Sequence, residues 1–538
     1  MSRILLNRRS FLHLTASAAA LTAMPGLGWA QGETPVKGGR LIVAGDSEPA
    51  NLNPAIVASN GVFFVASKIV EPLAEQSYDG KDGLSPRLAT AWEGSVDGLT
   101  ATFKLREGVT WHDGKPFTSA DVAFSALEVW KKLQNLGRVV FKNLESVETP
   151  DDHTAIFKFS QPTPFQLIRN ALPVVTSVVP KHLYEGTDIA KNPANQALVG
   201  TGPFKFGEHK PGEYYLLKRN EAYWQKDQPL LDVIVYQILP DRSSAGNALE
   251  AEQIQLAAFS AVPLADLARI SKVPGLKVYA NGYEGLTYQL IVEINHRRKE
   301  LADPKVRQAL AHAIDRDFVV KTIFLGYAKP STGPVPAYDK AFYEPDVAAH
   351  AFDPAKAEAL LDAAGYKRGA DGNRFTLKLL PAPFFNETKQ FGDYLRQALA
   401  KVGIDAQVVS NDTPAHLKAV YTDHDFDITV ATPVYRSDPA ISTTILFESG
   451  LPAGVPFSNQ YGYANADVDK LIKDAASTVD SDKRAGLYKQ LQKVVAEDLP
   501  LINVAEFSFI TVARDTVQNV SDNPRWAVSN WSNVWLKG

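Results

Sequence analysis

Apolar stretches with strand spacing, separated by turn-forming residues, pattern the first part of the chain. Strand-turn-strand patterns dominate residues 75–220, where Asp97-Gly98 predicts a tight hairpin. One helix interrupts them, because Thr118 can cap a helix and the Asp121 side chain can reach back, as in a capping box. The apolar spacing carries this helix through Val129. We therefore expect this part of the chain to be mainly β-structure.

Helical periodicity alternates with strands in the second part, from about residue 300 to residue 500. Pro304 begins an amphipathic helix, and Asp353-Pro354 begins another that ends at Gly365. Further along, apolar runs predict three strands with helical segments between them, at residues 375–379, 404–409 and 427–431. This β-α-β-α-β order predicts a mixed α/β lobe.

Strand character returns at the end of the chain, over residues 501–512. A return of this last segment to the first lobe leaves two crossings between lobes, near residues 285 and 500. We therefore predict lobe I at residues 31–284, lobe II at residues 285–499, and a return to lobe I at residues 500–538. The two crossings are the predicted hinges.

The first thirty residues have the three-part pattern of an export signal. A basic stretch containing Arg8-Arg9 precedes a modestly apolar run over residues 11–24, and small residues at 25–30 suit a signal peptidase. Adjacent arginines followed by Phe-Leu are similar to a twin-arginine signal, with a Sec signal as the alternative. A membrane anchor is disfavoured because the run is shorter than the ~20 residues that span a bilayer. We expect export to the periplasm and removal of residues 1–30.

Composition narrows the choice of partners. The chain has 538 residues, of which 45% are hydrophobic and 22% charged, as in soluble globular proteins of two or three domains. Removal of the signal takes away three arginines and no acid, which changes the formal charge from −4 to −7 and disfavours nucleic acid as a partner. Cysteine is absent, so disulfides, thiolate metal sites and a lipid anchor on an N-terminal cysteine are excluded.

Motifs for catalysis or nucleotide binding are not found. The P-loop, the His-Glu-x-x-His zinc motif and the Gly-x-Ser-x-Gly nucleophile elbow do not occur. Ten histidines are scattered without an i, i+4 pair, so neither a metal site nor a cofactor is expected. His112-Asp113 invites a catalytic interpretation, but Asp113-Gly114 is better explained as a turn that reverses the chain. We predict that the protein is not an enzyme.

Several separated blocks, in a fixed order, carry a family resemblance. They include Pro86-Arg87-Leu88-Ala89-x-x-Trp92, Trp111-His112-Asp113-Gly114-x-Pro116-Phe117-Thr118, Gly200-Thr201-Gly202-Pro203-Phe204 and Asp353-Pro354-x-Lys356-Ala357. From about residue 38 to its end, the chain resembles the extracytoplasmic solute-binding proteins of the peptide/nickel ABC-importer family, such as dipeptide- and oligopeptide-binding proteins. The resemblance implies an α/β periplasmic-binding-protein fold of two lobes and two hinge crossovers, with an extra domain inserted in lobe I at about residues 75–200.

The same resemblance implies a function and its partners. The lobes of such a protein close around a small polar ligand, here a peptide or peptide-like solute, and the closed form is recognised by the transmembrane subunits of an ABC permease. A monomer is expected from the family, with the export machinery as a transient partner.

Candidate ligand contacts follow from the resemblance as well. Ser59, Asn60 and Gly61 resemble the lobe I loop that offers backbone pairing to a ligand. Phe259 and Ser260 follow a block similar to the family's Ala-Leu-x-x-Gly-x-Ile-Asp. The segment from Thr432 to Tyr435 resembles the lobe II segment that lines the ligand channel. Each of these positions is alternatively a structural loop residue.

Tyr435 departs from the family pattern. In the peptide binders, an aspartate that anchors the ligand's amine lies three residues before an acidic residue and a proline; here that pair is Asp438-Pro439, and Tyr435 holds the aspartate's place. Tyrosine cannot offer full charge pairing, so a free amine would need another acid, namely Asp438, Glu48 or Glu284. An aspartate in this position, such as Asp438, is more often a turn former than a ligand anchor.

Because Tyr435 stands in place of the family's aspartate, ligands other than ordinary peptides are also candidates. Opines, oligosaccharides, haem and nickel compete with peptides within the same class of binding protein. A periplasmic peptide hydrolase or chaperone is the alternative from a different class.

Overall fold

The fold is described from a computed structural model that defines residues 34–57 and 59–538. The predicted export signal at residues 1–30 lies outside these ranges. The chain separates into two units, Met1–Val36 and Lys37–Gly538, and the description below concerns the second unit alone.

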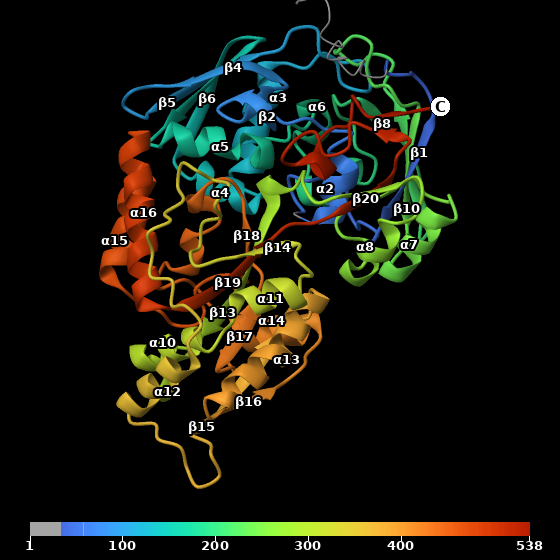
Figure 1. Cartoon of the computed structure of the whole chain (residues 1–538). Coiled ribbons are helices and arrows are strands. Elements are labelled where there is room, and N and C mark those ends of the chain that lie inside the picture. The colour runs from blue at the N-terminus through green and yellow to red at the C-terminus, as the bar shows by residue number, and fades with distance from the viewer. Residues whose placement is uncertain (1–33, 58) are drawn as a thin grey trace, which may run out of the picture. The chain divides into compact units, whose positions relative to one another are not determined.

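A seven-stranded sheet forms the centre of lobe I (Figure 1). Its strand order is β12-β20-β11-β1-β10-β9-β8, and β1 runs parallel to β10 and β11 while the other pairs are antiparallel. The strands are β1 (Arg40–Gly45), β8 (Phe204–Lys210), β9 (Tyr214–Arg219), β10 (Val233–Ile238), β11 (Leu256–Ala257), β12 (Leu276–Tyr279) and β20 (Thr511–Arg514). The helices of this lobe are α2 (Asn60–Ala66), α7 (Arg242–Glu250) and α8 (Leu264–Ile270).

A second seven-stranded sheet forms the centre of lobe II. Its order is β14-β19-β13-β17-β15-β16, with β18 paired to β13. The strands are β13 (Thr287–Ile294), β14 (Ala328–Pro330), β15 (Phe375–Pro381), β16 (Ile404–Val408), β17 (Ile428–Ala431), β18 (Val434–Tyr435) and β19 (Leu501–Phe507). The helices are α9 (Lys299–Ala302), α10 (Pro304–His312), α11 (Arg316–Thr322), α12 (Pro354–Ala363), α13 (Asn386–Lys401), α14 (Thr413–Tyr421), α15 (Ala466–Ser477) and α16 (Ser481–Asp498).

Local sequence explains where two helices of lobe II begin, and the predicted order of its strands and helices is observed. The Asp303 side chain accepts the backbone N–H of Lys305 at 2.8 Å to begin α10, with a proline at the first helical position. Asp353 begins α12 in the same way, by accepting the N–H of Lys356 at 2.9 Å. The predicted β-α-β-α-β order is confirmed by β15, α13, β16, α14 and β17, and β15 is parallel to both β16 and β17.

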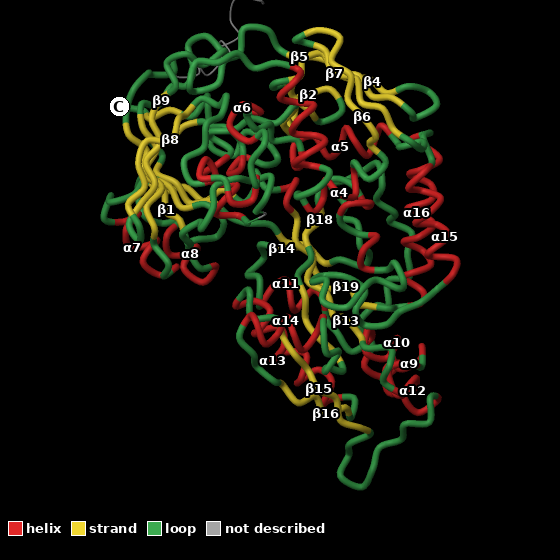
Figure 2. The backbone as a smooth tube through the Cα atoms, turned by 180° about the vertical axis from the view of Figure 1, so that it is seen from behind, coloured by secondary structure: helices red, strands yellow, loops and turns green. Residues whose placement is uncertain are grey.

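A four-stranded antiparallel sheet, in the order β4-β5-β7-β6, lies within the stretch predicted as an inserted domain. It has its own core, which includes Phe103, Trp130 and Phe157, and Figure 2 shows its strands as a band apart from the lobe I sheet. The predicted hairpin at Asp97-Gly98 is confirmed between β4 and β5. The elements are β4 (Ala89–Gly94), β5 (Thr100–Leu105), β6 (Leu144–Asp151), β7 (Thr154–Phe159), α3 (Ser119–Phe124), α4 (Asn135–Val140), α5 (Phe165–Val175) and α6 (Lys181–Tyr184).

The helix predicted after Thr118 begins where expected and then changes type. The Asp121 carboxylate accepts the backbone N–H of Thr118 at 3.0 Å, as the capping pattern predicted. After α3 the chain continues as a π-helical segment, η1 (Ser125–Trp130), rather than as one regular α-helix. Two short strand pairs complete the fold, β2 (Ala74–Lys81) with β3 (Leu84–Pro86) and β21 (Val517–Gln518) with β22 (Trp535–Leu536).

The chain passes between the two seven-stranded sheets twice, which gives two crossovers. The first lies between Tyr279, where β12 ends, and Thr287, where β13 begins. The second lies between Phe507, the last residue of β19, and Thr511, the first of β20. β19 pairs along β13, so the change of sheet comes after residue 507 and not at the predicted residue 500. An apolar strand pattern does not specify which sheet the strand joins; the lobe boundaries as such stay a prediction.

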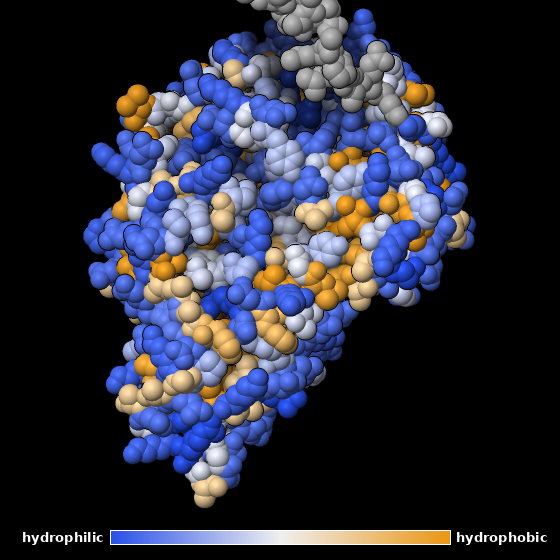
Figure 3. Space-filling view, in the orientation of Figure 1, coloured by the Kyte–Doolittle hydropathy of each residue, from blue (hydrophilic) through white to orange (hydrophobic). Residues whose placement is uncertain are grey.

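Apolar side chains mark where the two lobes approach each other. Hydrophilic residues cover much of the face in Figure 3, and prominent apolar areas lie near its middle, around α8 and α11. Leu264, the first residue of α8, packs against apolar cores of both lobes. The lobes are therefore in van der Waals contact beside the crossovers.

Candidate ligand-binding site

Aromatic side chains pack the two crossovers together. The ring of Tyr288, at the start of β13, lies 5.0 Å from the ring of Phe509 in the second crossover, centroid to centroid. Phe509 lies 5.6 Å from Tyr283, which belongs to the first crossover. Phe385 of lobe II lies 5.4 Å from Tyr288. These four rings form an apolar base that both crossovers share, and we call it the aromatic base.

Three of the predicted lobe I contacts lie at the start of α2, next to the aromatic base. The Ser59 hydroxyl accepts the backbone N–H of Val62 at 3.3 Å and so caps the helix. Gly61 is buried, and a Cβ atom there would lie 3.0 Å from a serine hydroxyl. The Asn60 amide donates to the hydroxyl of Tyr288 at 3.5 Å, which joins lobe I to β13. Of the three, Asn60 has a side chain that connects the lobes.

Phe259 and Ser260 lie beside the second crossover. Both have left-handed backbone conformations, with φ of 55° and 52°. The Phe259 ring lies 5.2 Å from that of Phe509. Ser260 donates its backbone N–H to the carbonyl of Ile510 at 2.9 Å, and its hydroxyl accepts the N–H of Ile510 at 3.0 Å. These two residues hold the return segment in place.

The predicted lobe II residues Thr432 and Tyr435 are buried. Tyr435 pairs with Thr287 in the sheet, and its hydroxyl donates to the Asp339 carboxylate at 2.6 Å. Burial raises the pKa of Asp339 to about 6, and the negative charge of Asp438 raises it too, although the bond from Tyr435 acts in the opposite direction. The tyrosine that replaces the family's aspartate therefore has its polar atom occupied within lobe II.

Asp438 is engaged in a fully buried ion pair. Its two carboxylate oxygens accept from the two terminal guanidinium nitrogens of Arg484 at 2.7 and 2.9 Å, and both side chains are 0% exposed. Asn170 of α5 donates to the same carboxylate at 3.0 Å, and Gln166 of α5 accepts from Arg484 at 3.2 Å. The pair thereby joins α16 of lobe II to the helix beside the four-stranded sheet.

The other two acids considered as amine anchors also have partners. Glu48 lies 2.7 Å from the ring Nε2 of His209 within lobe I. Glu284, in the first crossover, accepts from the Tyr78 hydroxyl at 2.6 Å. With Asp438 paired to Arg484, each of the three candidate acids is bonded to a residue of the protein itself.

Other polar residues join the lobes at the crossovers and were not predicted from the sequence. The Gln76 amide of β2 donates to the Ser437 hydroxyl at 2.6 Å. The Tyr338 hydroxyl lies 3.3 Å from the same oxygen. The guanidinium of Arg525 donates to the carbonyl of Gly285 at 3.1 Å. These residues are distant in the sequence, and no motif connects them. The one local indication of this region is the basic Arg436, which lies next to Ser437 and to the unusual Tyr435.

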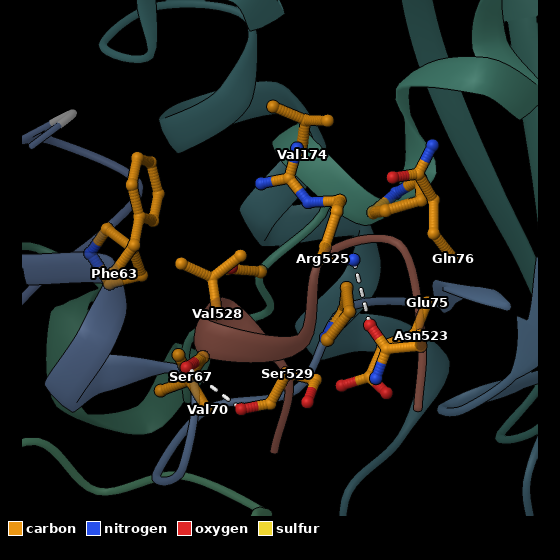
Figure 4. Close-up of a pocket in the computed structure, with 14 residues that line it drawn as sticks. Phe63, Ser67, Val70, Glu75, Gln76, Val174, Asn523, Arg525, Val528 and Ser529 are labelled. Atoms are coloured by element: carbon orange, nitrogen blue, oxygen red, sulfur yellow. Dashed lines mark hydrogen bonds between the residues drawn. The ribbon is translucent and has the colours of Figure 1, made fainter. Parts of the chain in front are cut away.

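A narrow cavity lies where β2, α2, α5 and the C-terminal segment meet (Figure 4). Its volume is about 30 Å³, which is room for a water molecule or two. Its polar residues include Glu75, Gln76 and Arg525, and its apolar ones include Phe63 and Val174. Figure 4 shows the Arg525 guanidinium next to Val174, pointing away from Asn523.

Two arginines, Arg436 and Arg525, contribute positive charge to this region. Burial lowers the pKa of Arg525 to about 10, and the positive charge of Arg436 lowers it further, whereas Tyr338 and the carboxylate of Glu75 act in the opposite direction. Burial also lowers the pKa of Arg436. Arg436 directly follows β18 in lobe II, whereas Arg525 belongs to the C-terminal segment that packs on lobe I.

The region of His112 is a turn, as predicted. The backbone N–H of Gly114 donates to the carbonyl of Trp111 at 2.8 Å, and Gly114 has a φ of 87°. Burial lowers the pKa of His112 to about 4, and its ring Nε2 lies 3.0 Å from the carbonyl of Gly202. Asp113 is bonded to His182 instead, at 2.7 Å. His112 and Asp113 do not form a catalytic pair with each other.

The part of the chain that the structure describes has neither a cluster of metal ligands nor a membrane-spanning helix. Over residues 34–57 and 59–538, no group of three or more His, Asp and Glu side chains is arranged to hold a metal ion. In the same residues, no helix combines the length and the apolarity that crossing a bilayer needs.

Comparison with known proteins places this arrangement in context. Residues 83–454 match the family described as "Bacterial extracellular solute-binding proteins, family 5 Middle". The dipeptide-binding protein of Escherichia coli K12 is 28% identical over 554 residues, which cover 97% of this chain and 98% of that protein.

Two solved structures are similar over nearly the whole chain. The oligopeptide-binding protein AppA of Bacillus subtilis, in complex with a nonapeptide, has a TM-score of 0.76 at 26% identity and covers 94% of this chain and 100% of its own. The periplasmic binding protein AgaA of Agrobacterium tumefaciens R10, in complex with agropinic acid, has a TM-score of 0.73 at 26% identity, covering 93% and 99%. The two-lobed α/β fold expected from the sequence is confirmed.

Proposed function

Since this chain belongs to family 5 of the bacterial extracellular solute-binding proteins, we propose that it captures a small polar solute between its lobes and delivers it to an ABC importer. The observation that carries this proposal is the convergence of polar side chains from both lobes at the crossovers. Gln76 of lobe I is bonded to Ser437 of lobe II, and Arg525 to Gly285 of the first crossover. A solute held there would contact both lobes at once.

The mechanism that we propose is closure about the two crossovers. The bonds from Gln76 to Ser437, from Asn60 to Tyr288 and from Asn170 to Asp438 join different lobes. Opening would exchange these bonds for bonds to water at a modest net cost of about 0.5–1.5 kcal/mol for each bond. The solute can therefore decide between the open and closed forms by binding the closed form more tightly. The transmembrane subunits of the permease would recognise the closed form.

The proposed location is the periplasm, reached through the export signal at residues 1–30. Its Arg8-Arg9 pair favours the twin-arginine route, and the mature protein is proposed to be a monomer. Fractionation of cells that express the full chain tests this route. We expect Arg8→Lys together with Arg9→Lys to abolish export, whereas export of this variant through an intact Sec pathway would assign the signal to Sec.

The proposed ligand class is a peptide or peptide-like polar solute. The names of the similar proteins support this class, because they include a dipeptide-binding protein and a complex with a nonapeptide. The complex with agropinic acid supports an opine as the alternative, and oligosaccharides, haem and nickel stay open. Tyr435 and the three paired acids argue against a site built around a ligand's free ammonium group.

Binding without catalysis is the proposed activity. Among the described residues, the Ser437 hydroxyl is bonded to the Gln76 amide and lies near the Tyr338 hydroxyl, neither of which is a base that would activate it as a nucleophile. Incubation of the purified protein with a peptide library would reveal cleavage products if it were a hydrolase.

Small-angle scattering of the mature protein, with and without an extract of small molecules from its own cells, tests the proposed function. We expect a fall in the radius of gyration with the extract, and native mass spectrometry should detect the retained compound. A protein that retains no compound and keeps its radius would contradict capture by closure.

A further inference from the structure

Arg525 carries a buried charge that has no acidic side chain of the described residues at ion-pair distance, although the more distant charge of Glu75 acts on it. Its residue is 5% exposed, and its guanidinium makes one protein hydrogen bond, to the carbonyl of Gly285 at 3.1 Å. A guanidinium has five N–H donors, so most of its donors are available to other groups. Its side chain lines the cavity of Figure 4, with the guanidinium next to Val174.

Arg436 approaches the same region from lobe II. It is partly buried, and its one protein hydrogen bond is a long one, 3.5 Å to the carbonyl of Val434. Its charge acts on Arg525, and the pKa of Arg436 responds in turn to the phenol of Tyr288 in the aromatic base. Gln76, which lies beside Arg525, is bonded at 2.6 Å to Ser437, the residue after Arg436, so these two like charges from different lobes lie in one region.

The carboxylates of this region are bonded to other residues. Glu75 pairs with Arg87 at 2.7 Å, and Glu284 accepts from Tyr78. Asp339 accepts from Tyr435, and Asp438 pairs with Arg484. Within residues 34–57 and 59–538, neither Arg436 nor Arg525 therefore has an acidic side chain at ion-pair distance.

Two buried guanidinium groups without acids are costly unless an anion joins them. The planar fork of arginine matches a carboxylate, which it can hold through two parallel bonds. A ligand's ammonium group would instead be repelled by both charges. An anion between Arg436 and Arg525 would also cancel a repulsion that acts across the lobes, and would thereby favour closure.

We propose that the solute of this protein is an acid whose carboxylate is bound by Arg436 of lobe II and Arg525 of the C-terminal segment. The proposal rests on the proposed capture function and names its ligand class. The side-chain oxygen Oε1 of Gln76 is buried and has no hydrogen-bond donor among the described residues. It lies beside Arg525, since a Cβ atom on Gly285 would touch both side chains, and it can accept an N–H or O–H of the same solute.

The test compares ligands with and without the acid group. Calorimetry would measure binding of di- and tripeptides as free acids, as C-terminal amides and as N-acetylated acids, together with N-carboxyalkyl amino acids and neutral oligosaccharides. We expect amidation of a bound acid to weaken its affinity about tenfold to a hundredfold, since bonds to charged groups are worth about 1.5–3 kcal/mol. N-acetylation should change affinity by less than about threefold, because no ammonium site is lost.

Variants assign the effect to the two arginines. Arg436→Gln and Arg525→Gln should remove most of the preference for acid over amide, and the glutamine of Arg525→Gln can still donate to Gly285. Arg396→Gln is the matched control, because Arg396 is exposed on α13 of lobe II, and it should leave the preference unchanged. Circular dichroism and melting temperatures verify that each variant is folded.

The outcomes are distinct. Acid-dependent binding of peptides or of N-carboxyalkyl amino acids supports the inference, and the better-bound class identifies the source of the carboxylate. A neutral or amidated compound that binds as tightly as its acid, with no effect of Arg436→Gln or Arg525→Gln, overturns the inference and leaves the capture function standing. A folded wild-type protein that binds none of these compounds and retains nothing from a cell extract contradicts both.

Discussion

Two groups of arginine side chains lie where lobe II contacts the rest of the protein, and they differ in their hydrogen-bond and ion-pair partners. Arg484 is fully buried and is bonded to both oxygens of Asp438, with further bonds to Gln166 and Tyr488. Arg436 and Arg525 each make one bond, to a backbone carbonyl. The first group satisfies its charge within the folded chain, and the second does not.

The difference in bonding partners distinguishes an arginine that stabilises the fold from arginines that can bind a ligand, whereas burial alone does not distinguish them. A buried charge that the chain itself pairs contributes to holding its elements together, as Asp438 and Arg484 join α16 to α5. A buried charge that the chain leaves unpaired lowers stability, and its donors are available to a partner from outside. The two groups should therefore respond oppositely when their charges are removed.

The largest expected effect is that of Asp438→Asn. The change leaves Arg484 buried without its anion, and we expect the free energy of unfolding to fall by about 3–5 kcal/mol. Urea denaturation of the ligand-free protein measures it. The double variant with Arg484→Gln should recover part of the loss. A loss below about 1 kcal/mol, which is typical of surface ion pairs, would contradict the conclusion that the pair of Asp438 and Arg484 stabilises the fold more than a surface pair does.

A smaller effect, on pH dependence, is expected from Asp339→Asn. Burial raises the pKa of Asp339 from its ordinary 3.8 to about 6. The folded form therefore binds more protons between these values than the unfolded form, so this group's contribution makes stability increase as pH falls through 6 toward 4. At pH 7 the charged form costs about 3 kcal/mol. The difference in stability between wild type and variant, measured from pH 4 to 7, should follow this curve; a constant difference would contradict it.

Next in size is the effect of Tyr435→Phe. The change removes the hydroxyl that donates to Asp339 and keeps the buried ring, so we expect a loss of about 1 kcal/mol in unfolding free energy. Solute affinity should stay within about twofold of wild type, since the hydroxyl is occupied inside lobe II. Calorimetry with the retained solute checks it. A large loss of affinity at unchanged stability would make Tyr435 a ligand contact.

The smallest effect on the ligand-free protein is expected from Arg525→Gln. Removal of an unpaired charge should change the unfolding free energy by no more than about 0.5 kcal/mol, or should raise it. The same urea titration measures it, beside Asp438→Asn. A loss as large as that of Asp438→Asn would show that Arg525 is a structural arginine like Arg484.

Much of the fold followed from local patterns. The helix starts at Asp303 and Asp353, the hairpin at Asp97-Gly98 and the turn at Gly114 are all set by residues adjacent in sequence. The sheet that β19 joins was not predictable in this way, because its apolar residues suit either sheet. The π-helical stretch after α3 likewise depends on packing that the periodicity does not contain.

Less of the site was predictable, because its properties come from pairs that are distant in sequence. The sequence pattern favoured a turn former over an anchor at Asp438, and it did not indicate the ion pair with Arg484, which lies 46 residues later. Arg436 gave a local signal beside the unusual Tyr435, but its meaning depends on acids being bonded elsewhere. A sequence can show a charge, whereas only the folded chain shows whether that charge has a partner.

A crystal structure of the mature protein with the solute that it retains from its own cells tests the central claim most directly. We predict one acidic solute between the lobes, with carboxylate oxygens within hydrogen-bond distance of Arg436 and Arg525. A solute bound elsewhere, or a neutral solute between the lobes with both arginines turned away from it, would contradict the account.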